Sequence, residues 1–319
     1  MIAKKIDLFE YFVLFREYRS PLSDLYIKRN QNTIIFGAYD DNDENIGLLL
    51  IRCFEDTSKI QYIKAFNDDI EIYKVLIDCA LIELRDKVKT LEWWIVDGAE
   101  KFDIEKKCAE ELKFACYNTL NIFRHTSVDK DKALAFVEKN RNISNWHIKR
   151  GYEIKSFEEL SKEQLDYMSN DPDGQFESSL HIDEYINNED MNLCKDKSFV
   201  CLKNGRIIAF ASVSLASKGN YIYDSTCVAK DYKMSGVFVP VNNAVFNAVF
   251  NSDYDTLMFA VYDTNTEMLP VFRKWLMPLI TSSTKQFNYI RPIDIPENKE
   301  WEDYRKKYEE KVLSKIGKD

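Results

Sequence analysis

A short cationic stretch that contains a glycine, residues 227–238, combines residue types suited to binding a phosphate. It follows an alternating apolar run over residues 221–224 and leads into an amphipathic helical pattern, so a strand, a loop and a helix succeed one another. The amides at a helix N-terminus and the helix dipole attract anions, and a glycine lets the backbone approach the ligand. With Lys233 and Gly236 in this loop, the stretch predicts a protein that binds a phosphorylated cofactor.

The composition is that of a folded protein without an excess of positive charge. The chain has 319 residues, 45% of them hydrophobic and 30% charged, and a formal net charge of −9. This length is enough for two domains with a core each. The negative charge disfavours nucleic acid as a partner and favours a cationic second substrate. No apolar run approaches the roughly 20 residues that span a bilayer, and the N-terminus lacks the apolar region of a signal peptide, so we expect no membrane partner.

The cysteines and histidines predict neither disulfides nor a metal site. Seven cysteines are scattered through apolar segments without a C-x-x-C pair, which indicates buried thiols in a reducing cytoplasm. The three histidines have no paired metal-ligand spacing. We therefore expect a cytoplasmic protein without a bound metal.

The expected elements occur in the same order in the two halves of the chain. In the first half, strands over residues 33–53 and 59–66 precede a helix, an apolar strand that ends at Asp97, and a further helix and strand. In the second half, strands over residues 198–215 and 221–228 precede a helix, an apolar strand that ends at Asp263, and a further helix and strand. The pattern favours two halves of one architecture, with a chance likeness of two ordinary α/β domains as the alternative.

The boundary between the halves is expected between Thr126 and Tyr152. Residues 130–139 have a helical pattern, whereas residues 141–145 are polar and typical of a loop. Beyond Ile295 the chain is highly charged, and Trp301 and Tyr304 predict a solvated terminal helix that docks through a few aromatic side chains. We expect domains over residues 1–135 and 150–319, the second with the charged terminal helix.

Five positions of the second half form a spacing pattern. Lys233 follows Val228 by five residues, Gly236 opens the next helix, and Phe272 follows Asn265 by seven residues. This pattern resembles the GNAT superfamily of N-acetyltransferases over roughly residues 198–277, whereas the first half matches only the order of elements. The resemblance implies an α/β (α+β) fold of two tandem GNAT-like domains, each with a mixed central sheet flanked by helices.

The sequence also departs from the family pattern. Phe238 replaces the second small residue of the loop, and Leu276 and Met277 stand where Gly-Phe is expected. Phe272 replaces the tyrosine that in many relatives protonates the leaving thiolate. These departures leave two alternatives open. One is a donor other than acetyl-CoA, and the other is an inactive ligand-binding or regulatory protein that keeps the fold.

The resemblance implies acetyl-CoA as co-substrate. Its pantetheine arm would lie in a gap between two splayed strands, and its pyrophosphate would bind the loop amides, with Lys233 adding charge. The cofactor-binding residues implied are Cys227, Val228, Lys233, Ser235, Gly236, Val237, Phe238, Asn265 and Phe272.

The resemblance further implies direct transfer of an acetyl group to a small-molecule or peptide amine. Asp224 is the candidate base, with a solvent-facing strand carboxylate as the alternative. Tyr232 is the candidate acid, with Tyr262 or solvent as alternatives. The acceptor would contact residues 169–188, in particular Phe176, His181 and Tyr185, although this segment also fits an ordinary surface loop.

The first half lacks these features at the corresponding place, residues 66–72. The segment has no glycine and no cation, and its three carboxylates would repel a phosphate. We predict that this half does not bind CoA and instead completes the acceptor cleft, with Asp68 and Asp69 as helix caps. The two halves are compatible with a monomer or a homodimer.

Overall fold

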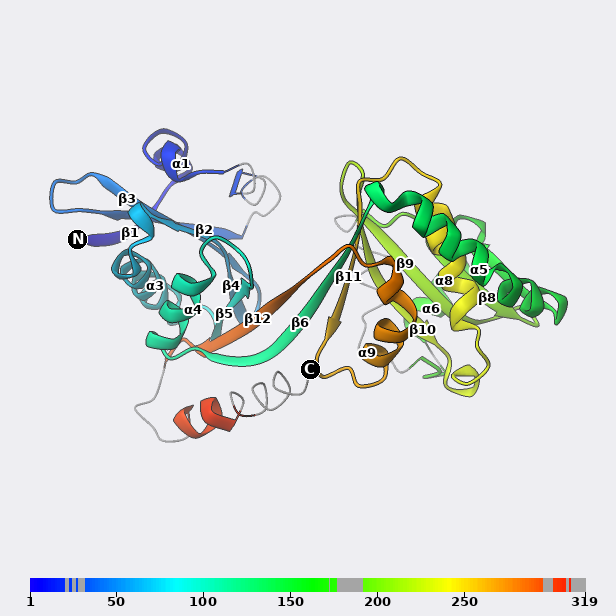
Figure 1. Cartoon of the computed structure of the whole chain (residues 1–319). Helices are drawn as coiled ribbons and strands as arrows, with labels where there is room; N and C mark the ends of the chain where they lie inside the picture. The colour runs from blue at the N-terminus through cyan, green and yellow to red at the C-terminus, as the bar shows by residue number, and fades with distance from the viewer. Residues whose placement is uncertain are drawn as a thin grey trace. The chain divides into compact units, whose positions relative to one another are not determined.

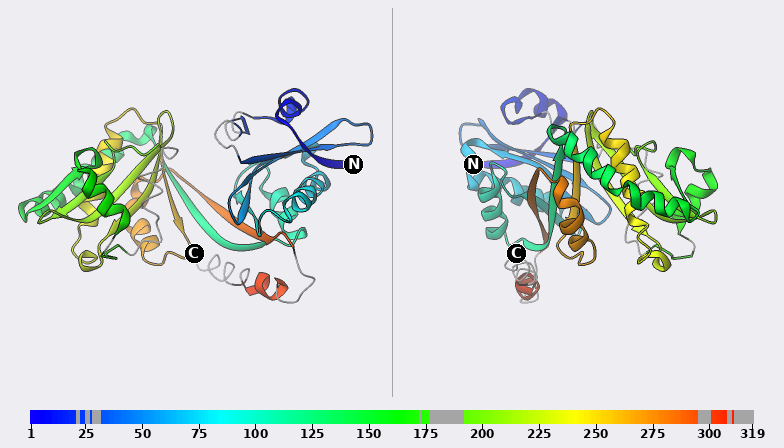
Figure 2. Two further views of the ribbon diagram at one scale, coloured as in Figure 1. Left: turned by 180° about the vertical axis from the view of Figure 1, so that it is seen from behind. Right: turned by 45° about the vertical axis from the view of Figure 1, so that its right-hand side comes forward.

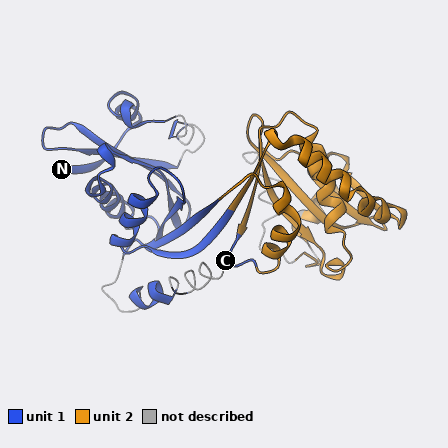
Figure 3. Cartoon of the chain, in the orientation of Figure 1, with its two compact units in different colours: residues 1–121, 262–265, 284–319 blue, residues 122–261, 266–283 orange. Residues whose placement is uncertain are grey.

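The computed structural model describes residues 1–20, 23–24, 27, 32–171, 173–176, 192–294, 301–307 and 310. The chain divides into two compact units (Figure 3). Unit 1 comprises residues 1–121, 262–265 and 284–319, and unit 2 comprises residues 122–261 and 266–283. Each unit has its own cluster of buried hydrophobic side chains, as the length of the chain predicts.

Unit 1 is a mixed sheet with helices on both faces (Figure 1). Its strands follow one another across the sheet in the order β1 (Ile2–Ile6), β2 (Thr33–Tyr39), β3 (Asn45–Cys53), β4 (Thr57–Ala65), β5 (Thr90–Val96), β12 (Ser282–Pro292) and β6 (Ala115–Thr126). Helices α3 (Ile70–Leu84) and α4 (Phe102–Glu111) pack on one face, where Leu49 and Ile51 of β3 lie. Helix α1 (Leu8–Val13) packs on the other face, against Leu48 and Leu50. Successive side chains of β3 therefore point into two different hydrophobic clusters.

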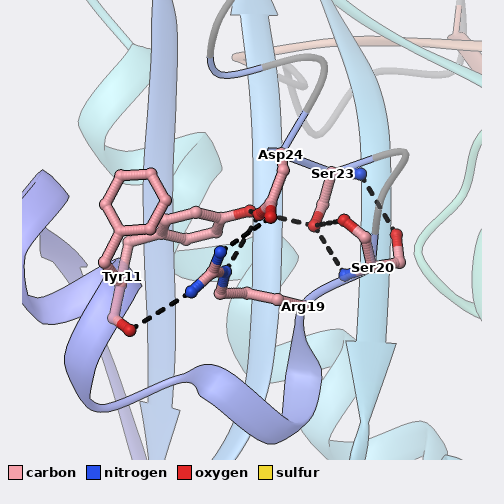
Figure 4. Close-up of polar contacts among 6 residues, drawn as sticks. Tyr11, Arg19, Ser20, Ser23 and Asp24 are labelled. Atoms are coloured by element: carbon pink, nitrogen blue, oxygen red, sulfur yellow. Dashed lines mark hydrogen bonds and ion pairs between the residues drawn. The ribbon is translucent and has the colours of Figure 1, made fainter.

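A polar cluster fixes the chain that follows α1 (Figure 4). The Tyr11 hydroxyl donates to Ser23 Oγ at 2.9 Å and to Asp24 Oδ1 at 2.8 Å. Arg19 donates from Nε and Nη2 to the two carboxylate oxygens of Asp24, at 2.9 and 2.7 Å. Burial raises the pKa of Tyr11 to about 12, so the phenol stays neutral. The cluster holds its own segment in place and serves a structural purpose.

Unit 2 also consists of mixed strands covered by helices. Its strand order is β6, β11 (Thr256–Tyr262), β10 (Asn220–Val228), β9 (Arg206–Ser217), β8 (Phe199–Lys203) and β7 (Tyr152–Ser156). Its helices are α5 (Lys130–Lys149), α6 (Lys162–Asn170), α8 (Phe238–Phe250) and the short α9 (Met268–Val271). Helix α8 buries an apolar side that includes Val241, Val245 and Phe246, and α5 lies alongside it (Figure 2).

The final strand predicted for the second half of the sequence lies largely in unit 1. Strand β12 pairs antiparallel with β5, from Gln286↔Val96 to Pro292↔Thr90. Strand β6, from the first half, continues into unit 2, where β11 is its neighbour. The units therefore divide the chain differently from the expected ranges 1–135 and 150–319. The described part of the terminal helix, residues 301–307, also belongs to unit 1, where the Trp301 indole donates to Lys113 O at 3.1 Å.

Helix α5 is longer than the sequence pattern predicts. Residues 141–145 are helical, not a loop, and polar side chains at this point bond to carbonyl groups one turn earlier in the helix. Asn140 Nδ2 donates to Phe136 O at 2.9 Å, and Ser144 Oγ donates to Asn140 O at 3.4 Å. The helix thus carries His147 to the end of unit 2 where the loop after β10 lies.

Candidate functional site

Strands β10 and β11 run parallel and separate midway. Their pairing covers four positions and stops at Tyr223↔Phe259. On its other edge β10 stays paired with β9 as far as Val228, and Asp224 is an extra residue without a partner in β9, a β-bulge. Beyond the bulge the pairing of β10 with β11 has ended, while its pairing with β9 continues. This is the splayed geometry that the sequence analysis expects beside Cys227 and Val228.

The loop after β10 has alternating open and occupied amides. In the described chain the amides of Met234, Gly236 and Phe238 donate to no acceptor. The Ser235 amide donates to a carbonyl three residues earlier at 2.9 Å, and the Val237 amide donates to Ser235 Oγ at 3.4 Å. Gly236 has φ of +78°, a conformation that favours glycine. Of the four amides expected to receive a pyrophosphate, two are open and two serve the loop itself.

Lys233, the cation of the loop, forms an ion pair. Its Nζ lies 3.3 Å from Glu267 Oε2, and the exposed fractions of the two side chains are 36% and 75%. An exposed pair of this kind contributes little to stability, about 0–1 kcal/mol. A phosphate could therefore replace Glu267 at low cost.

Asp224 lies on the bulge and is largely enclosed. Burial raises its pKa to about 7, while a hydrogen bond from Ser214 acts in the opposite direction. A carboxylate with this pKa can take up a proton near neutral pH. Ser214 fixes the orientation of the carboxyl group, and the assignment of Asp224 as the base stays a prediction.

The two aromatic candidates occupy different environments. Tyr232 ends the short 3₁₀ turn Lys230–Tyr232 and is half-buried against the core of unit 2. Phe272 is buried, with its ring centroid 5.8 Å from that of Phe123 and 5.7 Å from that of Phe259. Phe272, which stands where many GNAT relatives have a tyrosine, thus packs in the core of unit 2. Its assignment as a cofactor contact stays a prediction.

The expected acceptor segment is described in part. Phe176 is buried and rests edge-on against an aromatic ring of β9. The neighbouring Gln175 carbonyl accepts from the Lys230 amide at 2.9 Å, which ties the segment to the start of the loop. His181 and Tyr185 lie outside the described residues.

Asn265 follows β11 in the short segment 262–265, which belongs to unit 1. Its amide donates to Tyr262 O at 2.9 Å, so the backbone turns here directly after the strand. The assignment of Asn265 to the cofactor arm stays a prediction.

Two residues at the site were missed by reasoning from the sequence. Ser214 gave a weak signal, as a polar residue inside the apolar strand β9. No pattern in the sequence pointed to His147, because this residue lies far along the chain from the loop after β10. Its Nε2 lies 3.0 Å from Ser235 O, and its ring lies 3.6 Å from where a Cβ on Gly236 would be.

The corresponding place in unit 1 is closed by its own side chains. Asp69 caps α3 and accepts from the Glu71 amide at 2.9 Å, as predicted. Asp68 is not a cap; its carboxylate pairs with Lys101 Nζ at 2.7 Å. The helix N-terminus that could attract an anion therefore already carries carboxylates.

The remaining sequence-based expectations concern cysteines, metals and membranes. All seven cysteines are free thiols; Cys108, Cys116 and Cys201 are buried, whereas the other four are half-buried. Among the described residues, no three His, Cys, Asp or Glu side chains gather as a metal site would require. None of the described helices combines the length and the apolar character of a membrane span.

Comparison with known proteins identifies the fold. No family model and no curated protein sequence matches the chain. Among solved structures, it is similar to a tandem GNAT protein from the clavulanic acid biosynthesis pathway (TM-score 0.63, 11% identity, covering 92% of this chain and 100% of that one). It is also similar to a GCN5-related N-acetyltransferase from Sphaerobacter thermophilus (TM-score 0.62, 9% identity, 93% and 97%) and to a GNAT-family acetyltransferase from Colwellia psychrerythraea (TM-score 0.52, 13% identity, 91% and 100%). The chain therefore has the fold of a tandem GNAT protein.

Proposed function

We propose that the protein is an acyl-CoA-dependent N-acyltransferase that moves an acetyl group from acetyl-CoA to an amine, with the chemistry in unit 2. The observation that carries the proposal is that β10 separates from β11 after Tyr223 and is followed by a loop with open amides. The edge of β10 beyond the bulge can pair with the amide groups of a pantetheine arm, and the Gly236 and Phe238 amides can receive the diphosphate. Similar folds in named acetyltransferases support the same function.

Lys233 and Glu267 would exchange partners when acetyl-CoA binds. The diphosphate would replace the Glu267 carboxylate beside Lys233 Nζ, and the lysine would add a charge to the amide contacts. Gly236 has φ of +78°, which L side chains rarely adopt, so a glycine here lets the loop keep the backbone conformation that presents these amides. Cys227 and Val228 would supply backbone groups to the pantetheine.

In the reaction, the acceptor nitrogen attacks the thioester carbonyl while Asp224 takes up the amine proton. A bond forms between nitrogen and the acetyl carbon, the carbon–sulfur bond breaks, and CoA leaves as a thiolate. Tyr232 or solvent then supplies a proton to the sulfur. Phe272 has no proton to give, so the residue at this position cannot protonate the thiolate.

The acceptor is an amine in this proposal, either a small molecule or a peptide terminus. The net charge of −9 favours the approach of a cation. Asp224 would remove its proton, and the buried Phe176 would support the wall of the acceptor pocket rather than form its surface. We retain a cytoplasmic location as part of the proposal.

A thermal-shift titration with acetyl-CoA, followed by a thiol-release assay over a panel of amines, tests the function. A ligand at about 100 times its Kd stabilises the native state by about 2.7 kcal/mol. No shift at millimolar acetyl-CoA would exclude the transferase. A shift without thiol release from any amine would favour the inactive ligand-binding protein, an alternative that the phenylalanine at position 272 supports.

A further inference from the structure

Helix α5 sends one buried side chain to the loop after β10. His147 is only 2% exposed, and both of its ring nitrogens face carbonyl oxygens. Nδ1 lies 2.9 Å from Ile143 O, one turn earlier in α5, and Nε2 lies 3.0 Å from Ser235 O. A neutral ring donates one of these bonds and an imidazolium donates both. The histidine therefore joins the helix to the loop at a single peptide group.

That peptide group carries the central open amide. The bond between Ser235 and Gly236 is trans, as are all the described peptide bonds, so its C=O and N–H point in opposite directions. With Nε2 as the donor, His147 holds the Ser235 carbonyl, and the Gly236 N–H on the other side of the peptide is directed away from α5. In the described chain this N–H has no acceptor. The orientation of the donor is thus set by the hydrogen bond on the other side of the peptide.

The ring of His147 is itself fixed by packing. Trp146 and Tyr152 contact it edge-on, with ring centroids 4.7 and 5.2 Å away. Its Cε1 and Nε2 lie 3.6 and 3.7 Å from where a Cβ on Gly236 would be, so the ring supports the glycine from behind. A side chain held at this position limits rotation of the peptide between Ser235 and Gly236.

We propose that His147 is a positioning residue for the diphosphate of the acyl donor, acting through the Ser235 carbonyl to hold the Gly236 amide open. The inference rests on the proposed function, because it assumes that this loop binds acetyl-CoA. It assigns to α5, which connects the two halves of the sequence, a part in donor binding. His147 touches no reacting atom in this scheme.

The test compares donors with and without a diphosphate. His147→Phe keeps an aromatic ring but removes both ring nitrogens, and His147→Gln keeps an N–H donor. Calorimetry would measure the binding of acetyl-CoA and of S-acetylpantetheine, which lacks the diphosphate. We expect His147→Phe to weaken acetyl-CoA binding by about five- to tenfold, the range for one hydrogen bond, with S-acetylpantetheine unchanged. His147→Gln should recover most of the loss.

His125 provides a matched control in the same unit. Its ring is buried too, with Nδ1 2.7 Å from Leu279 O and Nε2 3.0 Å from the Tyr254 hydroxyl, but it contacts no residue of the loop in the described chain. His125→Gln should lower the unfolding temperature without discriminating between the two donors. If His147→Phe fails to fold, His147→Asn replaces it in the same titrations, because the shorter amide side chain cannot span the distance to the Ser235 carbonyl.

The outcomes separate the two proposals. If the native protein does not bind acetyl-CoA, the proposed function fails. If it binds and His147→Phe weakens both donors equally, or weakens neither, the positioning role is wrong while the function stands. A loss in His147→Gln as large as that in His147→Phe also contradicts the positioning role.

Discussion

Each unit has a parallel strand pair that separates at a β-bulge, but the connection after the bulged strand differs between the units. In unit 1, β4 pairs with β5 only as far as Ile60↔Trp93, and Gln61 is the extra residue, as Asp224 is in unit 2. A four-residue connection then leads from β4 to α3, compared with nine residues between β10 and α8. The longer connection carries Lys233 and the open amides of Met234 and Gly236, whereas the shorter one carries Asp68 and Asp69. The same strand geometry thus leads to two different connections, and it is the connection, not the bulge, that distinguishes the two units.

The charges in the two connections are reversed. In unit 2 the lysine is on the loop and its partner, Glu267, follows the next strand, whereas in unit 1 the carboxylate of Asp68 is on the loop and Lys101 follows the next strand. The buried ionisable groups beside the bulges differ in the same way. Burial raises the pKa of Asp224 to about 7 and lowers the pKa of Lys59 to about 7. The two units thus carry groups of opposite charge at corresponding places.

The largest expected effect is the loss of turnover in Asp224→Asn, with Gln61→Ala as the matched change in unit 1. Removing a general base typically lowers the turnover number by about 10²–10⁴-fold, while acetyl-CoA affinity should stay within about twofold. Gln61→Ala alters the corresponding bulge of unit 1 and should leave turnover unchanged. Steady-state kinetics with isothermal calorimetry would decide this, and equal losses in both variants would remove the functional difference between the units.

Gly236→Glu should abolish donor binding. The new negative charge in the loop would repel the diphosphate, and a side chain at φ +78° adds about 1–2 kcal/mol of strain, so we expect at least about a 100-fold loss in affinity. Gly98→Glu is the matched control, because Gly98 has φ +75° with nothing within 4 Å of an added Cβ. Titration calorimetry should show the loss only in Gly236→Glu; binding that survives would place the donor elsewhere.

Asp224→Asn and Lys59→Met should stabilise the protein with opposite pH dependence. The native state holds the Asp224 proton more tightly than the unfolded chain, so stability falls as pH rises from about 4 to about 7. Lys59 releases its proton more readily when native, so its burial destabilises below pH 7 and this loss disappears as pH rises toward 10.

Urea unfolding would measure both effects. We expect Asp224→Asn to be about 2–4 kcal/mol more stable than the native protein at pH 8 and equal to it at pH 4. We expect Lys59→Met to gain a similar amount at pH 6 and nothing at pH 10. If the gain in unfolding free energy changed with pH in the same direction for both variants, the buried groups beside the two bulges would not have opposite effects on stability.

The smallest effect concerns the exposed ion pairs. Glu267→Gln releases Lys233 and should tighten acetyl-CoA binding about two- to threefold at low salt, with the difference fading as salt screens the pair. Lys101→Gln, the mirror change in unit 1, should not alter donor affinity. Tighter binding from both variants would indicate a general change in charge rather than a local exchange of partners.

Much of this arrangement is encoded in local pattern. The alternation of residues 221–224 and the loop with Gly236 predict a strand, an open turn and a helix, and these are found. The Asp69 cap is predicted by its place before an apolar helix. The sequence analysis predicts a loop at residues 141–145 because the stretch is polar, and a polar stretch of a helix has the same composition as a loop.

The sequence by itself determined the two repeated sets of elements, the cationic loop, and the carboxylates that replace it in the first half, because periodicity, capping and charge act over a few residues. Only the tertiary structure decided that β12 pairs with β5, that Ser214 faces Asp224, and that His147 supports Gly236. These contacts join segments distant in the chain. Strand pairing and side-chain hydrogen bonds of this kind depend on which surfaces meet after folding, and no short stretch of residues encodes that choice.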